Sequence, residues 1–212
     1  MKKLLFWMVL ICSVAVILTS CSKDEESTTA ASTSVTSTTA SGSITVGSET
    51  LSGTYVSTCN TTQFAAAAGT SMFPSDVKSG KTVIVVTSDT TFSDEMLMYT
   101  DTSCSTPTSY TKNGNTSVTV GVASGSNYLV TYTSSTYKVQ ADTTVAETHL
   151  EPYILAATGS AVDLTVGTEH SISGSGNSYK NVWSVTSTTF QQGEEDRSTQ
   201  PTVIDSMVMT KE

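Results

Sequence analysis

The hydrophobic pattern divides the chain into three unlike stretches. Residues 4–18 form an almost unbroken apolar run, LLFWMVLICSVAVIL. Residues 22–43 are rich in Ser and Thr and contain hardly any large apolar side chain. From residue 44 onward, short apolar or alternating segments recur between polar turns, which is typical of β-strands. The pattern predicts one folded region, residues 44–212, behind an N-terminal apolar segment and a polar linker.

The folded region is predicted to be all β. In residues 117–123 (SVTVGVA) every second residue is Val, so three valines share one face of a strand. Residues 82–87 (TVIVVT) suit a strand that is buried on both faces. Further strands are expected at residues 53–59, 91–100, 128–133, 136–141, 182–189 and 203–210. Many short strands with polar turns predict a single antiparallel β-barrel or a sandwich.

Clusters of Gly, Asn and Ser mark the expected turns. They lie at residues 112–115 (KNGN), 125–127 (GSN) and 173–177 (SGSGN). Residues 64–68, with four alanines, are the one helix-like stretch, and they are too short to form a stable helix alone.

The N-terminus has the layout of an export signal. Lys2 and Lys3 precede the apolar run, which at 15 residues is shorter than the roughly 20 needed to span a bilayer. Residues 18–21 (LTSC) resemble the lipobox of bacterial lipoproteins. The resemblance implies that residues 1–20 are a cleaved signal peptide and that lipid on Cys21 anchors the protein to a membrane. The alternative is an ordinary signal peptide in which a cysteine falls at this position by chance.

Localisation and linker follow from the next residues. The resemblance favours the outer membrane, because Ser22 replaces the Asp that retains such proteins in the inner membrane. After Cys21, the Ser/Thr-rich stretch to residue 43 cannot bury enough apolar surface to fold, so a disordered tether is expected. As a flexible coil it would span roughly 26 Å.

The charge excludes some partners. The signal segment holds two of the ten basic residues and none of the nineteen acidic ones, so the mature chain has a formal net charge of −11. Nucleic acid is bound through clustered Lys and Arg, so it is not an expected partner. The negative charge is typical of a soluble surface, with a cation-binding surface as the alternative.

Two cysteines, Cys59 and Cys104, remain in the folded region after Cys12 leaves with the signal and Cys21 takes lipid. An exported domain lies in an oxidising compartment, which favours a disulfide between them. A reactive thiol pair is the alternative, although the chain has no Cys-x-x-Cys spacing.

Three short segments resemble lipocalin-like domains of small secreted bacterial proteins. Residues 51–59 (LSGTYVSTC) resemble the first strand of such a barrel, with Tyr55 at the position of the Trp in the Gly-x-Trp motif. Residues 99–107 are similar to a Y-x-D-x-x-C-x-x-P segment, and residues 197–211 to the closing strand. The resemblance implies a calycin-type antiparallel barrel with a Cys59–Cys104 bridge. It implies no catalytic residues.

Catalytic and metal-binding patterns are not found. His149 and His170 lie 21 residues apart without metal-ligand spacing, and no Gly-x-Ser-x-Gly motif is present. Acidic residues cluster at residues 94–95, within an expected strand, and at residues 194–196, where a solvated loop is favoured over a cation site. We therefore expect no enzyme activity, no metal and no cofactor.

A ligand pocket inside the barrel is one interpretation of the large apolar side chains, and plain core packing is the other. The candidate pocket residues are Tyr55, Phe92, Met96, Met98 and Trp183. On these grounds the sequence favours a membrane-anchored envelope protein with a non-catalytic structural or interaction role. The alternative is a lipocalin-like binding module for a small apolar ligand. Expected partners are the membrane, through Cys21, and an apolar ligand or an envelope or host macromolecule.

Overall fold

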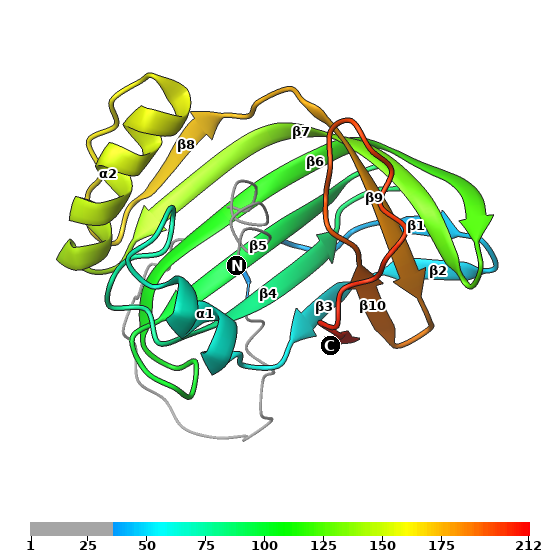
Figure 1. Ribbon diagram of the computed structural model, residues 1–212, viewed down its shortest axis with the longest axis horizontal. Helices are drawn as coiled ribbons and strands as arrows, with labels where there is room; N and C mark the ends of the chain where they lie inside the picture. Colours follow the sequence, from blue (N-terminus) through cyan, green and yellow to red (C-terminus); the bar gives the residue numbers. More distant parts are fainter. Residues whose placement is uncertain (1–35) are drawn as a thin grey trace, which may run out of the picture.

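A computed structural model describes residues 36–212 of the chain. The predicted signal peptide, the lipidation site Cys21 and most of the predicted tether lie outside the described residues. The described part contains a two-stranded hairpin, a large sheet and two helices (Figure 1). Among its helices, none is long and apolar enough to cross a membrane.

The large sheet is a meander that closes on itself. Its strands are β3 (Thr54–Ser57), β4 (Ser79–Val86), β5 (Phe92–Tyr99), β6 (Pro107–Ser124), β7 (Asn127–Ala141), β9 (Ser178–Val185), β10 (Thr189–Gln192) and β11 (Met209–Lys211). Each strand pairs antiparallel with the next, and β11 pairs with β3. Within residues 36–212 these eight strands form a closed antiparallel barrel, which confirms the all-β barrel prediction and excludes the sandwich.

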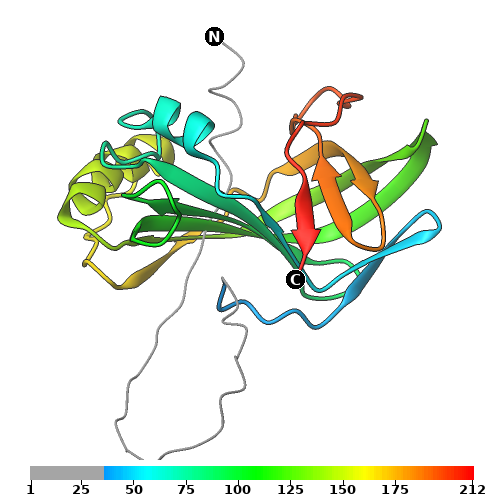
Figure 2. The same cartoon turned by 90° about the horizontal axis from the view of Figure 1, so that it is seen from below.

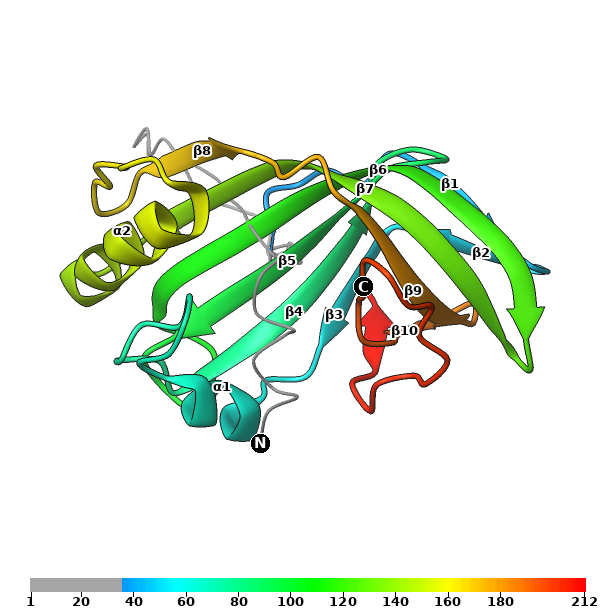
Figure 3. The ribbon, with the colours of Figure 1, turned by 45° about the horizontal axis from the view of Figure 1, so that its top comes forward.

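The remaining elements cover the barrel. They are the hairpin β1 (Ser43–Val46) and β2 (Glu49–Ser52), and the helices α1 (Thr61–Ala67) and α2 (Thr144–Thr158). The strand β8 (Glu169–Ser173) belongs to the large sheet but not to the closed set of eight strands. β8 extends the sheet along the second half of β7, whose first half pairs with β9. Both helices lie at the same end of the molecule, away from β9, β10 and β11 (Figures 2 and 3).

Two apolar clusters fill the molecule. One, at the end with the short strands, is dominated by aromatic side chains: Tyr55, Phe92, Tyr132, Tyr179, Trp183 and Phe190. The other packs α1 and α2 onto the sheet and includes Phe64, Met96, Met98, Leu150 and Ile154. We call them the aromatic cluster and the helical cluster.

The helix α2 was not predicted from the sequence. Its N-cap is Thr143, whose hydroxyl accepts the backbone N–H of Ala146, and it ends at Gly159 in the left-handed conformation. Thr and Gly are common helix-capping residues, but Pro152 is unusual inside a helix and argues against one in this segment. The expected short helix is present as α1, capped by Asn60.

The prediction of a turn at residues 112–115 is also wrong, because these residues lie within the strand β6. Both neighbouring strands bond to this part of β6, so tertiary pairing overrides the local turn preference. Gly114 serves close packing: a Cβ there would lie 2.2 Å from Thr136 Oγ1. The expected turns at residues 125–127 and 173–177 do join strands.

Strand boundaries differ in three further places. The two segments expected at residues 128–133 and 136–141 form the single strand β7. The segment expected at residues 182–189 is divided between β9 and β10, and only the end of residues 203–210 is a strand, as β11.

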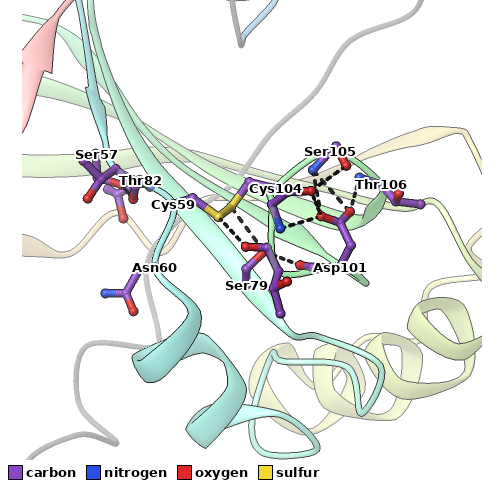
Figure 4. Close-up of a disulfide and its surroundings, with 12 residues drawn as sticks. Ser57, Cys59, Asn60, Ser79, Thr82, Asp101, Cys104, Ser105 and Thr106 are labelled. Carbon is purple, nitrogen blue, oxygen red and sulfur yellow. Dashed lines mark hydrogen bonds between the residues drawn. A yellow bond between two sulfur atoms is a disulfide. The ribbon is translucent and has the colours of Figure 1, made fainter.

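A disulfide joins Cys59, after β3, to Cys104, in the loop between β5 and β6 (Figure 4). The predicted bridge is thus confirmed and the reactive thiol pair excluded. Asp101 organises the loop by accepting hydrogen bonds from the backbone N–H and hydroxyl of Ser103 and the N–H of Thr106. These donors, led by the Ser103 hydroxyl, hold the pKa of Asp101 below its usual range.

Candidate functional site

A cavity of about 660 Å³ lies where the aromatic and helical clusters meet. Its walls come from β6, β7, α2 and the segment after it, β8, the loop between β8 and β9, the start of β9, and the loop after β10. The lining residues are Asn113, Ser134, Tyr137, Tyr153, Ile154, Ala157, Thr158, Ser160, Val162, Ser171, Ile172, Ser173, Ser175, Asn177, Tyr179 and Arg197. The volume falls in the range of small-molecule sites.

The deep side of the cavity belongs to the barrel interior. Asn113 of β6 and Ser134 of β7 line it and are both buried. Asn113 pairs with Tyr137 across the β6–β7 ladder, and both line the cavity, so their side chains share the inner face. This side is the floor of the cavity, and the wall of α2 and β8 faces it.

The floor contains buried polar atoms without protein partners. Asn113 is 1 % exposed, yet neither its Nδ2 nor its Oδ1 has a hydrogen-bond partner in the described structure. The same holds for both polar side-chain atoms of Asn115 and for Oδ1 of Asp94. Each such group costs about 1–3 kcal/mol relative to a satisfied one. Buried polar groups are normally paired, so a cluster of unpaired ones is a candidate recognition site.

Asp94 lies beside Asn113, since the two residues are register partners between β5 and β6. Burial raises the pKa of Asp94 to about 8, opposed by a hydrogen bond from Gln192 and reinforced by the charge of Glu95. At neutral pH the protonated form of this carboxyl therefore dominates.

A second carboxyl, that of Glu195, approaches the same region from the loop after β10. It accepts a hydrogen bond from the Tyr132 hydroxyl. Burial and the charge of Asp94 raise its pKa well above the usual range, while Arg197 lowers it. The fold thus brings together one residue from each acidic cluster of the sequence.

Neither acid lines the cavity itself. Asp94 lies beside Asn113 in the β5–β6 register and interacts electrostatically with Glu195, but neither carboxyl presents a nucleophile or acid to the space. Of the lining side chains, only Arg197 carries a formal charge. Its guanidinium donates to the Tyr179 hydroxyl (Nη2–Oη 2.9 Å) and its Cζ lies 5.3 Å from the centre of that ring.

The five side chains predicted from the sequence to form a pocket are all buried, but none lines this cavity. Tyr55, Phe92 and Trp183 belong to the aromatic cluster, while Met96 and Met98 belong to the helical cluster. Trp183 contacts the rings of Phe92 and Phe190 edge-on, each with a centroid distance of 5.3 Å. In these positions the five residues form core packing on either side of the cavity.

Sequence reasoning missed Asn113 because the KNGN motif was assigned to a turn. A signal was present: Asn113 and Asn115 alternate within a β-rich segment that carries Thr and Val on both sides. His149 and His170 have structural contacts, to the Ser71 carbonyl and the Thr165 N–H. No three His, Cys, Asp or Glu side chains gather as a metal site within residues 36–212.

Comparisons with known proteins add no family to this description. No protein-family profile matches the chain, and a search of curated protein sequences finds no match.

Proposed function

We propose that this protein is a membrane-anchored binding module for a small molecule, with no catalytic role. The cavity of about 660 Å³ carries the proposal, because it is of ligand size and reaches from the surface wall of α2 and β8 to the barrel interior. An eight-stranded barrel is a rigid frame that can hold one small ligand. The anchor is inferred from Cys21 and the lipobox-like residues 18–21.

The proposal joins a lipid anchor at Cys21 to a ligand-binding barrel. One lipid chain gives only marginal membrane binding, so stable attachment at Cys21 needs a second chain or another signal. A Ser/Thr-rich segment between Cys21 and the barrel would hold the cavity clear of the headgroups. The proposal is therefore consistent with the envelope protein expected from the sequence, and it specifies small-molecule binding as its interaction.

A plugged cavity tests the binding role. Ala157 is exposed on α2 and lines the cavity, so Ala157→Trp places a large side chain in the space without disturbing the core. Ala156→Trp is the matched control, since Ala156 is exposed on the same helix but does not line the cavity. Native mass spectrometry of the full chain, released from its host without denaturation, should detect a small co-purifying mass in the parent and in Ala156→Trp.

The same mass should be absent from Ala157→Trp. A mass retained equally by both variants would place the ligand elsewhere, and its absence from all three proteins would count against a tightly bound ligand. Radiolabelled palmitate incorporated by the parent and not by Cys21→Ser checks the anchor independently.

A further inference from the structure

The chemistry of the cavity wall limits the ligand that it can take, provided that the proposed binding role is correct. Nine of the lining residues carry hydroxyl groups: Ser134, Tyr137, Tyr153, Thr158, Ser160, Ser171, Ser173, Ser175 and Tyr179. Two more, Asn113 and Asn177, carry amides. Aliphatic surface is confined to Ile154, Ala157, Val162 and Ile172. Such a wall can exchange many neutral hydrogen bonds and offers Tyr rings for apolar contact.

Asn113 sets the requirement at the floor. Its side chain offers two donor hydrogens on Nδ2 and an acceptor on Oδ1, and none of these has a protein partner in the described residues. A ligand that satisfies both atoms must present a donor and an acceptor close together. A pair of neighbouring hydroxyls, or a hydroxyl beside an amide, does so.

An apolar ligand fails this requirement. If a hydrocarbon chain filled the floor, Asn113 would stay unpaired and would also lose access to water, at a cost of about 1–3 kcal/mol. Sites built to hydrogen-bond a polar group reject analogues that lack it by large factors for the same reason. The small apolar ligand expected from the sequence therefore does not fit this cavity.

A charged ligand fits no better. No carboxylate lines the cavity, so a cationic group would find no counterion there. An anionic group at the floor would lie beside Asp94, a largely protonated carboxyl that offers it no cationic partner. Arg197 is the one lining cation, and it already contacts the Tyr179 hydroxyl and ring. The charge distribution favours a neutral ligand.

We propose that the cavity binds a neutral, hydroxyl-rich ligand of the saccharide class, with Asn113 as the side chain that selects it. Hydroxyl pairs on the sugar satisfy Asn113 and the Ser and Thr side chains of the wall. The C–H faces of the sugar ring pack on the tyrosines. This inference rests on the proposed binding role and adds the class of ligand.

Saturation-transfer NMR on the purified full chain tests the ligand class. The probes are maltose, cellobiose and N,N′-diacetylchitobiose, with palmitate and spermidine as the apolar and cationic comparators. We expect saturation transfer to the ring protons of at least one disaccharide and none to palmitate or spermidine at equal concentration. Affinity for that disaccharide should fall at least tenfold in both Asn113→Leu and Ala157→Trp, and stay unchanged in Ala156→Trp.

Each other outcome overturns the saccharide proposal. Palmitate or spermidine binding that Ala157→Trp abolishes would keep the cavity as a binding site and assign it a different ligand class. Disaccharide binding that survives Ala157→Trp would place a saccharide site outside the cavity. If no probe binds and no co-purifying mass depends on Ala157, both the ligand class and the binding role fail. A thermal melt of Asn113→Leu, together with the exposed-site variant Ala157→Trp, distinguishes lost recognition from lost folding.

Discussion

The two ends of the barrel use their interiors differently. At one end the aromatic cluster is continuous, with Trp183 0 % exposed and edge-on to Phe92 and Phe190. At the other end α1 and α2 cover the sheet (Figure 3). The cavity begins at α2 and β8 and reaches Tyr179 at the edge of the aromatic cluster. Close aromatic packing leaves no room for a ligand, whereas a helix laid across a sheet can leave ligand-sized space. The comparison predicts that the aromatic cluster contributes more to stability than the region around α2, where the proposed ligand site lies.

Removing the central aromatic side chain should give the largest effect. Trp183→Ala should lower the free energy of unfolding by about 4 kcal/mol, because it deletes the ring that links Phe92 and Phe190. Tyr153→Ala, in the cavity wall on α2, should cost clearly less, since Tyr153 is half-buried. Urea unfolding measures both. Equal losses would show that the two ends contribute alike to stability.

Two buried asparagines sharpen the comparison. Asn181 is satisfied: its Oδ1 accepts from the N–H groups of Val182 and Gly193, and its Nδ2 donates to the Tyr132 hydroxyl. Asn181→Leu should therefore destabilise the protein by about 2 kcal/mol. Asn113→Leu removes unpaired polar atoms at similar volume, so it should stabilise the ligand-free protein by about 1 kcal/mol.

Thermal and urea unfolding of the two leucine variants, measured side by side without ligand, check this contrast. A loss of stability in Asn113→Leu as large as that in Asn181→Leu would show that Asn113 is a structural residue. Stabilisation with loss of binding is the signature of a residue that is kept for recognition.

The buried carboxyl of Asp94 should make the stability of the protein depend on pH. Folding raises the pKa of Asp94 from 3.8 to about 8, so the unfolded chain releases this proton at lower pH than the folded chain. Stability should therefore fall as pH rises from 4 to 8, by up to about 1 kcal/mol per pH unit. Asp94→Asn should flatten this fall.

Asp101 is the opposite control for the pH experiment. Its folded-state pKa is lowered, so its contribution is present at neutral pH and is lost as pH falls through acid values. Melting temperatures from pH 3 to 8 for the parent, Asp94→Asn and Asp101→Asn test both signs. An unchanged slope between pH 4 and 8 in Asp94→Asn would mean that this carboxyl is ionised in the folded protein.

The strands that the sequence predicted best are those whose pattern is local. Residues 82–87 and 91–100 were assigned close to β4 and β5, because β-branched and apolar runs suit buried strands wherever they lie. Residues 112–115 and 144–158 were misassigned, for opposite reasons. In the first, pairing with β5 and β7 overrode a turn motif. In the second, Pro152 interrupted the pattern of a helix that is stabilised by burying Ala146, Leu150 and Ile154.

The candidate site shows the same division. The sequence indicated which large side chains lie in the interior, and in the structure the five candidate pocket residues pack in the two apolar clusters. It identified two acidic clusters, and only closure of the barrel brought Asp94 near Glu195 across about a hundred residues. No single-sequence pattern reports which of two faces of a strand meets a cavity, because that depends on what α2 and β8 cover.

By itself, the sequence determined that the folded region is built of antiparallel strands and that Cys59 and Cys104 are the pair available for a disulfide. Alternation, turn residues and cysteine count are short-range properties, and they can be read along the chain. Only the tertiary structure decided that the strands close into a barrel, that α2 leaves a cavity of about 660 Å³ beside it, and that Asn113 is buried there without a partner. These features arise from contacts between residues far apart in sequence. Such contacts decide which polar groups are buried and unpaired, and so what each costs in free energy.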